Sequence, residues 1–137
     1  LNKDILKIYD YSDIKKRYID FKYDNVSENF WKFIKNNIFF FKESFEWIDI
    51  TKDEKIYIND SSEFLTIASK LLPDDPYNEN SWDIWTNLIK NKTKKSGKDL
   101  FLPLRIALTG RKQGPELKLL MPLLTKSQIL KKLRFNK

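Results

Sequence analysis

Apolar residues recur at helical spacing along most of the chain. Behind Ser27, large apolar side chains follow one another at intervals that are typical of an amphipathic helix. Serine is also a favoured residue at a helix N-terminus. This helix is expected to break near Asn36 and Asn37, where the pattern is interrupted. Its apolar positions are Phe30, Trp31, Phe33, Ile34, Ile38 and Phe41.

Similar patterns elsewhere bring the expected total to about nine helices. Residues 54–60 alternate apolar and polar side chains as a strand does. No second segment of similar quality is present to pair with them, so an extended linker is expected instead. The predicted fold class is therefore all-α. The other expected helices lie near residues 4–9, 13–23, 45–51, 61–72, 79–91, 98–109, 116–122 and 125–134.

Turn-forming residues predict where the later segments separate. The two prolines at 73 and 76 indicate a turn. Residues 90–98 are polar and rich in lysine, which predicts a loop, and Gly110 is a typical stop for the helix before it. The linker divides the chain into an expected N-terminal helical lobe, residues 1–60, and a C-terminal helical lobe, residues 61–137.

The composition excludes several kinds of chemistry. The chain contains no cysteine and no histidine. Ser-His and Cys-His nucleophile pairs, histidine metal ligands and a disulfide framework are therefore excluded, and no catalytic or metal site is expected. The lack of cysteine suits a reducing, cytoplasmic setting. No apolar run approaches the roughly 18 residues that a membrane-spanning helix needs.

Basic residues gather toward the C-terminal end. The net charge is +7, but residues 1–70 hold 12 basic and 13 acidic residues. From Lys90 onward, 14 basic residues face only Asp99 and Glu116. A charge field confined to one end favours a polyanionic partner, although a solvated basic surface has the same composition.

Residues 110–115 form a candidate binding loop. Two glycines and a lysine invite comparison with a phosphate-binding loop, but that motif requires Gly-Lys-Ser/Thr after a strand. Contact with RNA fits better, because Gly114 permits a close backbone approach and Pro115 fixes the chain direction. A plain turn with solvated charges stays an alternative. The side chains that offer donors to phosphates and base edges are Arg111, Lys112 and Gln113.

Arg105 is a lone basic residue within an apolar helix pattern. A half-buried guanidinium must be paired or bound to an anion. It either forms a structural pair or extends its charge to solvent, or it directs its planar donors at a base edge or a phosphate. The residues alone leave these alternatives open.

The aromatic clusters are expected to be core, because most of them recur at helical spacing. Phe39, Phe40 and Phe41 are the exception, since three consecutive residues cannot all face inward on one helix. One of them is expected to contact a neighbouring domain. The acidic pairs at 53–54 and 74–75 are expected to lie in solvated turns without partners.

Three short motifs in the C-terminal half carry a resemblance to a known family. They are Pro-Leu-Arg at 103–105, Ala-Leu-Thr-Gly at 107–110 and Gly-Pro-Glu-Leu at 114–117. In this order they resemble the C-terminal anticodon-binding region of bacterial glutamyl-tRNA synthetases. Weaker support comes from Trp47 and from the spacing of Trp82 and Trp85.

The resemblance implies a two-lobed, all-α region of a class I aminoacyl-tRNA synthetase that holds the anticodon arm of tRNA-Glu. ATP, with magnesium, and glutamate would be used by a catalytic domain absent from this chain. Because the first residue is Leu rather than Met, the chain is expected to be a piece of a longer protein. A cytoplasmic monomer without membrane association is expected.

The resemblance also implies which residues contact RNA. Arg105, Gly114 and Leu117 fall where family members contact the first and second anticodon bases, and Pro115 lies between two of these positions. All four belong to the C-terminal lobe.

A further position concerns the third anticodon base. Asn37 falls near a place where some family members carry an arginine that favours C over G at that base, and the loose alignment there also admits Lys35 or Asn36. Asparagine departs from that pattern. The resulting hypothesis is that the parent enzyme also charges tRNA-Gln.

Two other functional classes stay open at this point. A helical DNA-binding protein would need a recognition helix with exposed base-reading side chains, whereas the basic residues here fall in expected loops and helix ends. A module that docks on a protein or an acidic membrane would use the final helix, which is mildly amphipathic but short.

Overall fold

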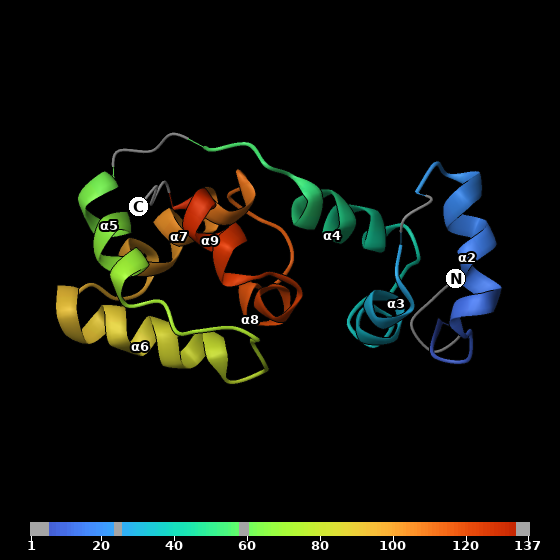
Figure 1. Cartoon of the computed structure of the whole chain (residues 1–137), viewed down its shortest axis with the longest axis horizontal. Helices are drawn as coiled ribbons and strands as arrows, with labels where there is room; N and C mark the ends of the chain where they lie inside the picture. Colours follow the sequence, from blue (N-terminus) through green and yellow to red (C-terminus); the bar gives the residue numbers. More distant parts are fainter. Residues whose placement is uncertain (1–5, 24–25, 58–60, 134–137) are drawn as a thin grey trace. The chain divides into compact units, whose positions relative to one another are not determined.

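The structure of the chain is a computed structural model that describes residues 6–23, 26–57 and 61–133. Within these ranges it contains helices and no strand, which confirms the all-α prediction (Figure 1). Residues 53–57 have no regular structure, while 58–60 and the first two residues of the expected helix at 4–9 lie outside the described residues. The helices are α2 (Tyr11–Asp20), α3 (Glu28–Ile34), α4 (Glu43–Lys52), α5 (Ser62–Lys70), α6 (Ser81–Thr93), α7 (Lys98–Thr109), α8 (Leu117–Leu120), the 3-10 helix η1 (Met121–Leu123) and α9 (Lys126–Lys132).

The chain divides into two compact units. The N-terminal unit is Leu1–Asp49 and the C-terminal unit is Ile50–Lys137. The boundary expected from the sequence, at residue 60, falls on a position outside the described residues and stays a prediction. Each unit has a core of its own.

Side-chain caps begin the helices of the N-terminal unit. At the start of α2, the Asp10 carboxylate accepts the Asp13 N–H at 3.1 Å, and the Asp13 carboxylate accepts the Asp10 N–H at 3.2 Å. The N-cap of α2 is thus Asp10, and this pair satisfies two donors at once. Ser27 accepts the Phe30 N–H at 3.1 Å and caps α3, as predicted.

The core of the N-terminal unit is built on aromatic rings. Trp31 is fully buried, and its indole N–H donates to the carbonyl of Tyr9 at 3.1 Å. Helix α3 ends at Ile34, close to the predicted break, and Phe41 returns to the core with 5% exposure. Phe39 and Phe40 are 60% and 58% exposed, so the prediction that the three phenylalanines cannot all face inward is confirmed.

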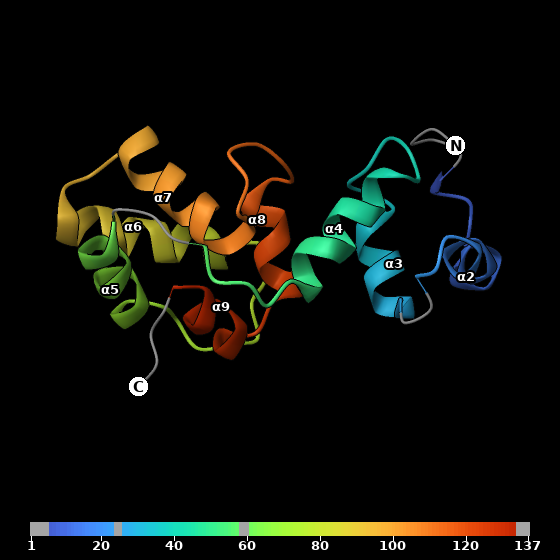
Figure 2. The same ribbon diagram turned by 90° about the horizontal axis from the view of Figure 1, so that it is seen from above.

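The C-terminal unit packs α5 to α9 around a second buried tryptophan (Figures 1 and 2). Trp85 is fully buried, and its indole N–H donates to the carbonyl of Ala68 at 2.9 Å, which joins α6 to α5. Its ring meets Trp82 edge-on, with the ring centres 5.6 Å apart. Helix α6 also packs against α8, and α7 packs against α9.

One loop is much shorter than predicted. The lysine-rich stretch was expected to be a loop over residues 90–98, but α6 continues to Thr93 and α7 already begins at Lys98. Lys94 ends α6 in the left-handed conformation, with φ of 62°. The prediction was wrong because lysine is a good helix former, and Lys90 and Lys92 lie on the exposed side of the helix.

The last helices begin and end where the sequence predicts. Gly110 stops α7 in the left-handed conformation, with φ of 70°. Thr125 caps α9 by accepting the Gln128 N–H at 3.2 Å, while the Gln128 side chain accepts the Thr125 N–H at 2.8 Å. None of the helices in the described part of the chain has the length and apolar character that crossing a bilayer requires.

Candidate nucleic-acid interface

The loop between α7 and α8, residues 110–116, projects from the helices of the C-terminal unit (Figure 2). Its start is fixed by Thr109, which is buried at the end of α7. The Thr109 hydroxyl lies 2.8 Å from the Arg105 carbonyl and accepts the Arg111 N–H at 3.0 Å. The chain therefore leaves the helix in a defined direction.

Gly110 is packed against Tyr57. A Cβ at position 110 would overlap the Tyr57 ring, and the positive φ of this residue favours glycine independently. Glycine is therefore required here both by space and by backbone conformation.

The end of the loop is fixed by Arg105. Its Nη1 donates to the carbonyl of Pro115 at 3.0 Å, and its side chain is half-buried. Leu117 follows with 5% exposure, so its side chain belongs largely to the core. Of the alternatives for Arg105, the structure shows a hydrogen bond to the backbone of the loop. This bond uses one of the five N–H donors of a guanidinium.

Between these two fixed points the loop presents its donors to solvent. Arg111, Lys112, Gln113 and Gly114 are all exposed. Gly114 has φ of 153°, and Pro115 after it is half-buried. The structure therefore brings five of the predicted site residues, 111–115, onto one loop, whose backbone is held at both ends and whose exposed side chains at 111–113 are donors.

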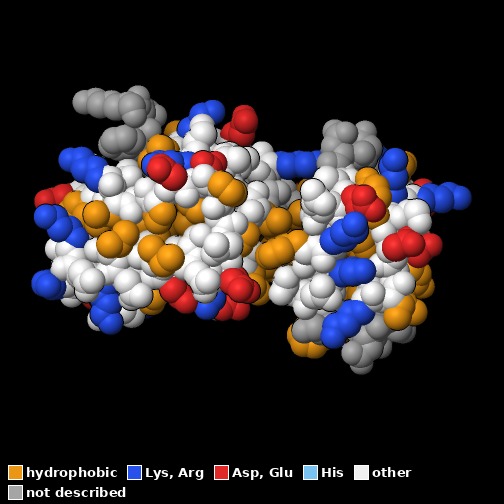
Figure 3. Space-filling model, turned by 60° about the horizontal axis from the view of Figure 1, so that its bottom comes forward, with side chains coloured by type: hydrophobic (Ala, Val, Ile, Leu, Met, Phe, Trp, Pro, Cys, Tyr) orange, Lys and Arg blue, Asp and Glu red, His pale blue; other side chains and the backbone are white. Residues whose placement is uncertain are grey.

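The net charge is distributed unequally between the N-terminal and C-terminal units. The N-terminal unit contains nine basic and nine acidic residues, whereas the C-terminal unit contains 17 basic and 10 acidic residues and thus carries the whole net charge of +7. Figure 3 shows hydrophobic side chains exposed among the charged ones. In the described part of the C-terminal unit the large ones are Ile56, Ile84, Leu88 and Phe101.

A hollow of about 330 Å³ lies beside the loop, and the sequence did not predict it. Phe101 is 41% exposed there, and its ring centre is 6.3 Å from that of Trp82. Phe101 lies one helical turn before Arg105, a spacing that places both on the same face and could have indicated the hollow. An ion pair of 2.9 Å joins α6 to α8. The lining residues are Trp82, Asp83, Phe101, Arg105, Glu116, Leu117 and Lys118.

The two candidate residues of the N-terminal unit are already hydrogen-bonded within that unit. Lys35 follows α3, and its Nζ donates to the carbonyl of Tyr9 at 3.4 Å. The Asn37 side-chain amide donates to the carbonyl of Phe33 at 2.9 Å. Asn36 between them is exposed. Contact of Lys35 or Asn37 with a base would require these side chains to exchange partners.

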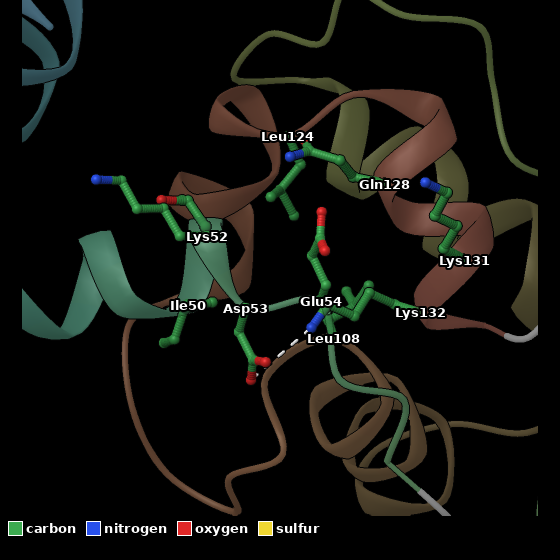
Figure 4. Close-up of a pocket in the computed structure, with 10 residues that line it drawn as sticks. Ile50, Lys52, Asp53, Glu54, Leu108, Leu124, Gln128, Lys131 and Lys132 are labelled. Atoms are coloured by element: carbon green, nitrogen blue, oxygen red, sulfur yellow. Dashed lines mark ion pairs between the residues drawn. The ribbon is translucent and has the colours of Figure 1, made fainter. Parts of the chain in front are cut away.

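The sequence suggested that the acidic pair at 53–54 lies in a solvated turn without partners. In the structure this is wrong, because Asp53 has partners. Asp53 accepts a hydrogen bond from the Tyr57 hydroxyl and lies 3.9 Å from Nζ of Lys132 (Figure 4). Burial raises the pKa of Asp53, but the hydrogen bonds from Tyr57 and from the Lys55 N–H, with the charge of Lys132, lower it overall. The expectation failed because Lys132 lies far away in sequence.

The second acidic pair has partners too. The Asp74 carboxylate is 2.6 Å from Nζ of Lys126, and Asp75 accepts the Lys126 N–H at 3.1 Å. The hydrogen bond from Lys126 lowers the pKa of Asp74. This pair remains exposed, as predicted, but it anchors the start of α9.

Comparison with known protein families identifies the family of this chain. The family model described as "Anticodon binding domain" matches residues 25–136. The chain belongs to the anticodon-binding domain family. Membership confirms the resemblance seen in the sequence and does not favour the DNA-binding or membrane-docking alternatives.

Curated relatives of this anticodon-binding domain are glutamate–tRNA ligases. Glutamate–tRNA ligase 1 of Rickettsia typhi is 42% identical over 97% of the chain, and glutamate–tRNA ligase 1 of Rickettsia prowazekii is 40% identical over 97%. Glutamate–tRNA ligase 2 of Ehrlichia canis is 36% identical over 99% of the chain. The domain spans 30%, 30% and 31% of the length of these three proteins.

Proposed function

We propose that this domain binds the anticodon loop of a tRNA within a glutamyl-tRNA synthetase. The observation that carries the proposal is the loop at 110–116, which is fixed at both ends and exposes its donors between them. Unpaired RNA bases are recognised on their edges by donors held in a set geometry. Family membership and the names of the relatives supply the class of partner.

Within this proposal, each loop residue has a role that follows from its position. Arg111, Lys112 and Gln113 donate to phosphates and base edges, and Gly114 lets a base approach the backbone. Arg105 holds the loop through Pro115 and offers its remaining N–H donors to the RNA. Phe101 adds an exposed aromatic face in the neighbouring hollow, on which a base can stack.

The chemistry of aminoacylation belongs to another part of the parent enzyme. Among the described residues no cluster of three acidic side chains is suited to a metal ion, and the glycine-containing loop follows a helix rather than the strand of a phosphate-binding loop. These residues do not fit ATP with magnesium. We propose that a catalytic domain elsewhere in the protein uses ATP, magnesium and glutamate to charge tRNA-Glu, and that the parent is a cytoplasmic monomer.

Recognition of the third anticodon base determines whether the parent enzyme also accepts tRNA-Gln. Asn37 stands near the position where some family members carry arginine, and its amide donates to the Phe33 carbonyl in the last turn of the preceding helix, α3. No charged side chain at position 37 therefore selects C over G. On this basis the parent would also accept tRNA-Gln.

The test is binding of the chain to tRNA-Glu and to a transcript of the same tRNA with a changed anticodon, at two salt concentrations. We expect a log–log salt slope of about −2 to −4, from three to five phosphate contacts with single-stranded RNA. The unchanged anticodon should bind more tightly, and Arg105→Ala should remove that preference. Equal binding of both transcripts by the natural chain would contradict the proposal.

Two further variants make this result specific. Arg105→Lys keeps a donor for the Pro115 carbonyl but lacks the planar fork, so it separates loop fixation from base contact. Arg17→Ala, in the N-terminal unit, removes an exposed arginine of the same charge and should leave the preference unchanged.

A further inference from the structure

Tyr57 is in contact with the residue at which the loop 110–116, the reading loop of the proposed function, begins. It lies in the irregular segment after α4, 53 positions before Gly110. Its ring occupies the space that a side chain at position 110 would need. The left-handed turn of Gly110 is therefore covered by a side chain from a distant part of the sequence.

The hydroxyl and the ring of Tyr57 each have a partner that holds the side chain in place. Its hydroxyl donates to the Asp53 carboxylate, and Nζ of Lys132 lies 5.4 Å from the centre of its ring, within the range of a cation–π interaction. Lys132 is only 7% exposed and donates to the carbonyl of Lys55 at 3.0 Å. The segment 53–57 is thereby fastened to α9, as the Asp53–Lys132 pair in Figure 4 shows.

These contacts are costly to maintain, which argues that they do more than fill space. Burial lowers the pKa of Lys132, although the charges of Asp53 and Glu54 oppose this effect. A lysine enclosed in this way loses its hydration and needs partners that restore it. The partners present are a carboxylate, a carbonyl and the face of the same tyrosine that covers Gly110.

We propose that Tyr57 is a positioning residue for the reading loop, held by Asp53 and Lys132, and that it contributes to anticodon discrimination without touching RNA. The RNA part of this inference rests on the proposed function. Tyr57 limits the backbone at Gly110, and Gly110 sets the direction in which Arg111 to Gln113 leave α7. Removal of the ring leaves a turn of the same sequence with more conformations, which weakens a geometry-dependent contact more than a charge contact.

The first experiment measures the loop directly, without RNA. Amide hydrogen exchange is followed at Arg111 in the natural chain, in Tyr57→Ala and in Tyr57→Phe. We expect exchange at Arg111 to be roughly 3- to 10-fold faster in Tyr57→Ala, because this variant has neither the ring that packs on Gly110 nor its cation–π interaction. Tyr57→Phe keeps the ring over Gly110 and should change exchange less. Unchanged exchange in Tyr57→Ala would overturn the inference.

Tyr77 provides a matched control in the same unit. It is 7% exposed, and its hydroxyl donates to the carbonyl of Pro73 at 2.8 Å, so it also fastens a turn, but a different one. Tyr77→Ala should lower thermal stability without accelerating exchange at Arg111. Equal acceleration by both alanine variants would mean general destabilisation rather than positioning, and would also overturn the inference.

The second experiment measures discrimination. In Tyr57→Ala, the ratio of Kd values for the changed and unchanged anticodon should fall by roughly 2- to 30-fold. The Kd for the changed anticodon, which reports charge contacts, should stay the same. If the natural chain shows no preference, the proposed function fails while the exchange result still stands. If the natural chain discriminates and Tyr57→Ala does so equally well, the positioning role fails alone.

Discussion

The two units use the same means to build a core and differ in what they expose. Each contains a fully buried tryptophan whose indole N–H donates to a backbone carbonyl, Trp31 to Tyr9 and Trp85 to Ala68. Yet the N-terminal unit has no net charge, and the C-terminal unit carries all of it. Helical packing is therefore common to both units, and the surplus of basic residues distinguishes the C-terminal one.

The candidate site residues of the two units differ in whether their donors are already hydrogen-bonded within the protein. Lys35 and Asn37 direct their donors at carbonyls of their own unit. Lys112 and Gln113, in the C-terminal unit, are exposed on a loop whose ends are fixed. Under the proposed function, the exposed donors of the C-terminal unit can bind RNA directly, whereas the N-terminal residues must first give up existing hydrogen bonds.

The largest expected effect comes from removing either tryptophan. Trp85→Ala and Trp31→Ala should each destabilise their own unit by about 3–5 kcal/mol, because a large cavity and an unpaired carbonyl result. Thermal denaturation followed by NMR shows which unit unfolds. Trp85→Ala should abolish discrimination at the first two anticodon bases, whereas Trp31→Ala should spare it. Loss of that discrimination in both variants would mean that the units do not act separately.

Neutralising lysines tests the difference in charge. Changing the five exposed lysines from 90 to 98 to glutamine should weaken binding of the changed and unchanged anticodons equally, by roughly tenfold at low salt. The salt slope should flatten by about 0.7 for each phosphate that no longer pairs with a lysine. The substituted residues are Lys90, Lys92, Lys94, Lys95 and Lys98.

A matched set of exposed lysines in the N-terminal unit serves as the control. Changing five lysines there to glutamine alters the net charge by the same amount, but it should flatten the salt slope less. An equal effect of the two sets would show that overall charge, rather than its location, determines binding. The control residues are Lys7, Lys15, Lys16, Lys22 and Lys42.

A change in selectivity, rather than in overall affinity, is expected from Asn37→Arg. The variant should reduce binding of tRNA-Gln relative to tRNA-Glu by roughly 5- to 150-fold, since one base-specific contact is worth about 1–3 kcal/mol. The ratio of the two Kd values measures this. Asn36→Arg and Lys35→Arg are the controls, and selectivity gained at Asn36 instead would move the third-base contact to that residue.

The smallest effect concerns acid stability. A carboxylate with a lowered pKa in the folded state adds stability above its unfolded pKa, about 3.9 for aspartate, and this stability is lost as the pH falls through the folded pKa. Because the pKa of Asp53 is lowered, Asp53→Asn should remove part of the acid-induced loss of stability in the C-terminal unit. Urea denaturation at a series of pH values measures it. A parallel shift at every pH would contradict this linkage.

Local signals explain which features the sequence predicted well. Ser27, Thr125 and Gly110 mark helix ends through short-range hydrogen bonds or backbone conformation, so their neighbours in sequence suffice to identify them. The different exposure of Phe39, Phe40 and Phe41 was predicted from helical geometry, but these residues lie between α3 and α4, outside both helices. Features that depend on three or four consecutive residues can be predicted from them.

Long-range contacts explain what the sequence did not predict. Tyr57 appeared in an alternating stretch that resembled a strand, and nothing near it indicates contact with Gly110. Lys132 resembled an ordinary cation at a helix end, yet it is buried against Asp53. Arg105 was recognised as unusual, but its partner, the Pro115 carbonyl, depends on how the chain returns after α7.

The two glycines at the ends of α7 have a practical consequence for protein engineering. Gly97 and Gly110 have φ of 57° and 70°, and both conformations strongly favour glycine. They mark the two ends of the 12 residues of α7. Under the proposed function, a library limited to residues 111–113, just beyond the second glycine, is a compact starting point for an altered anticodon preference.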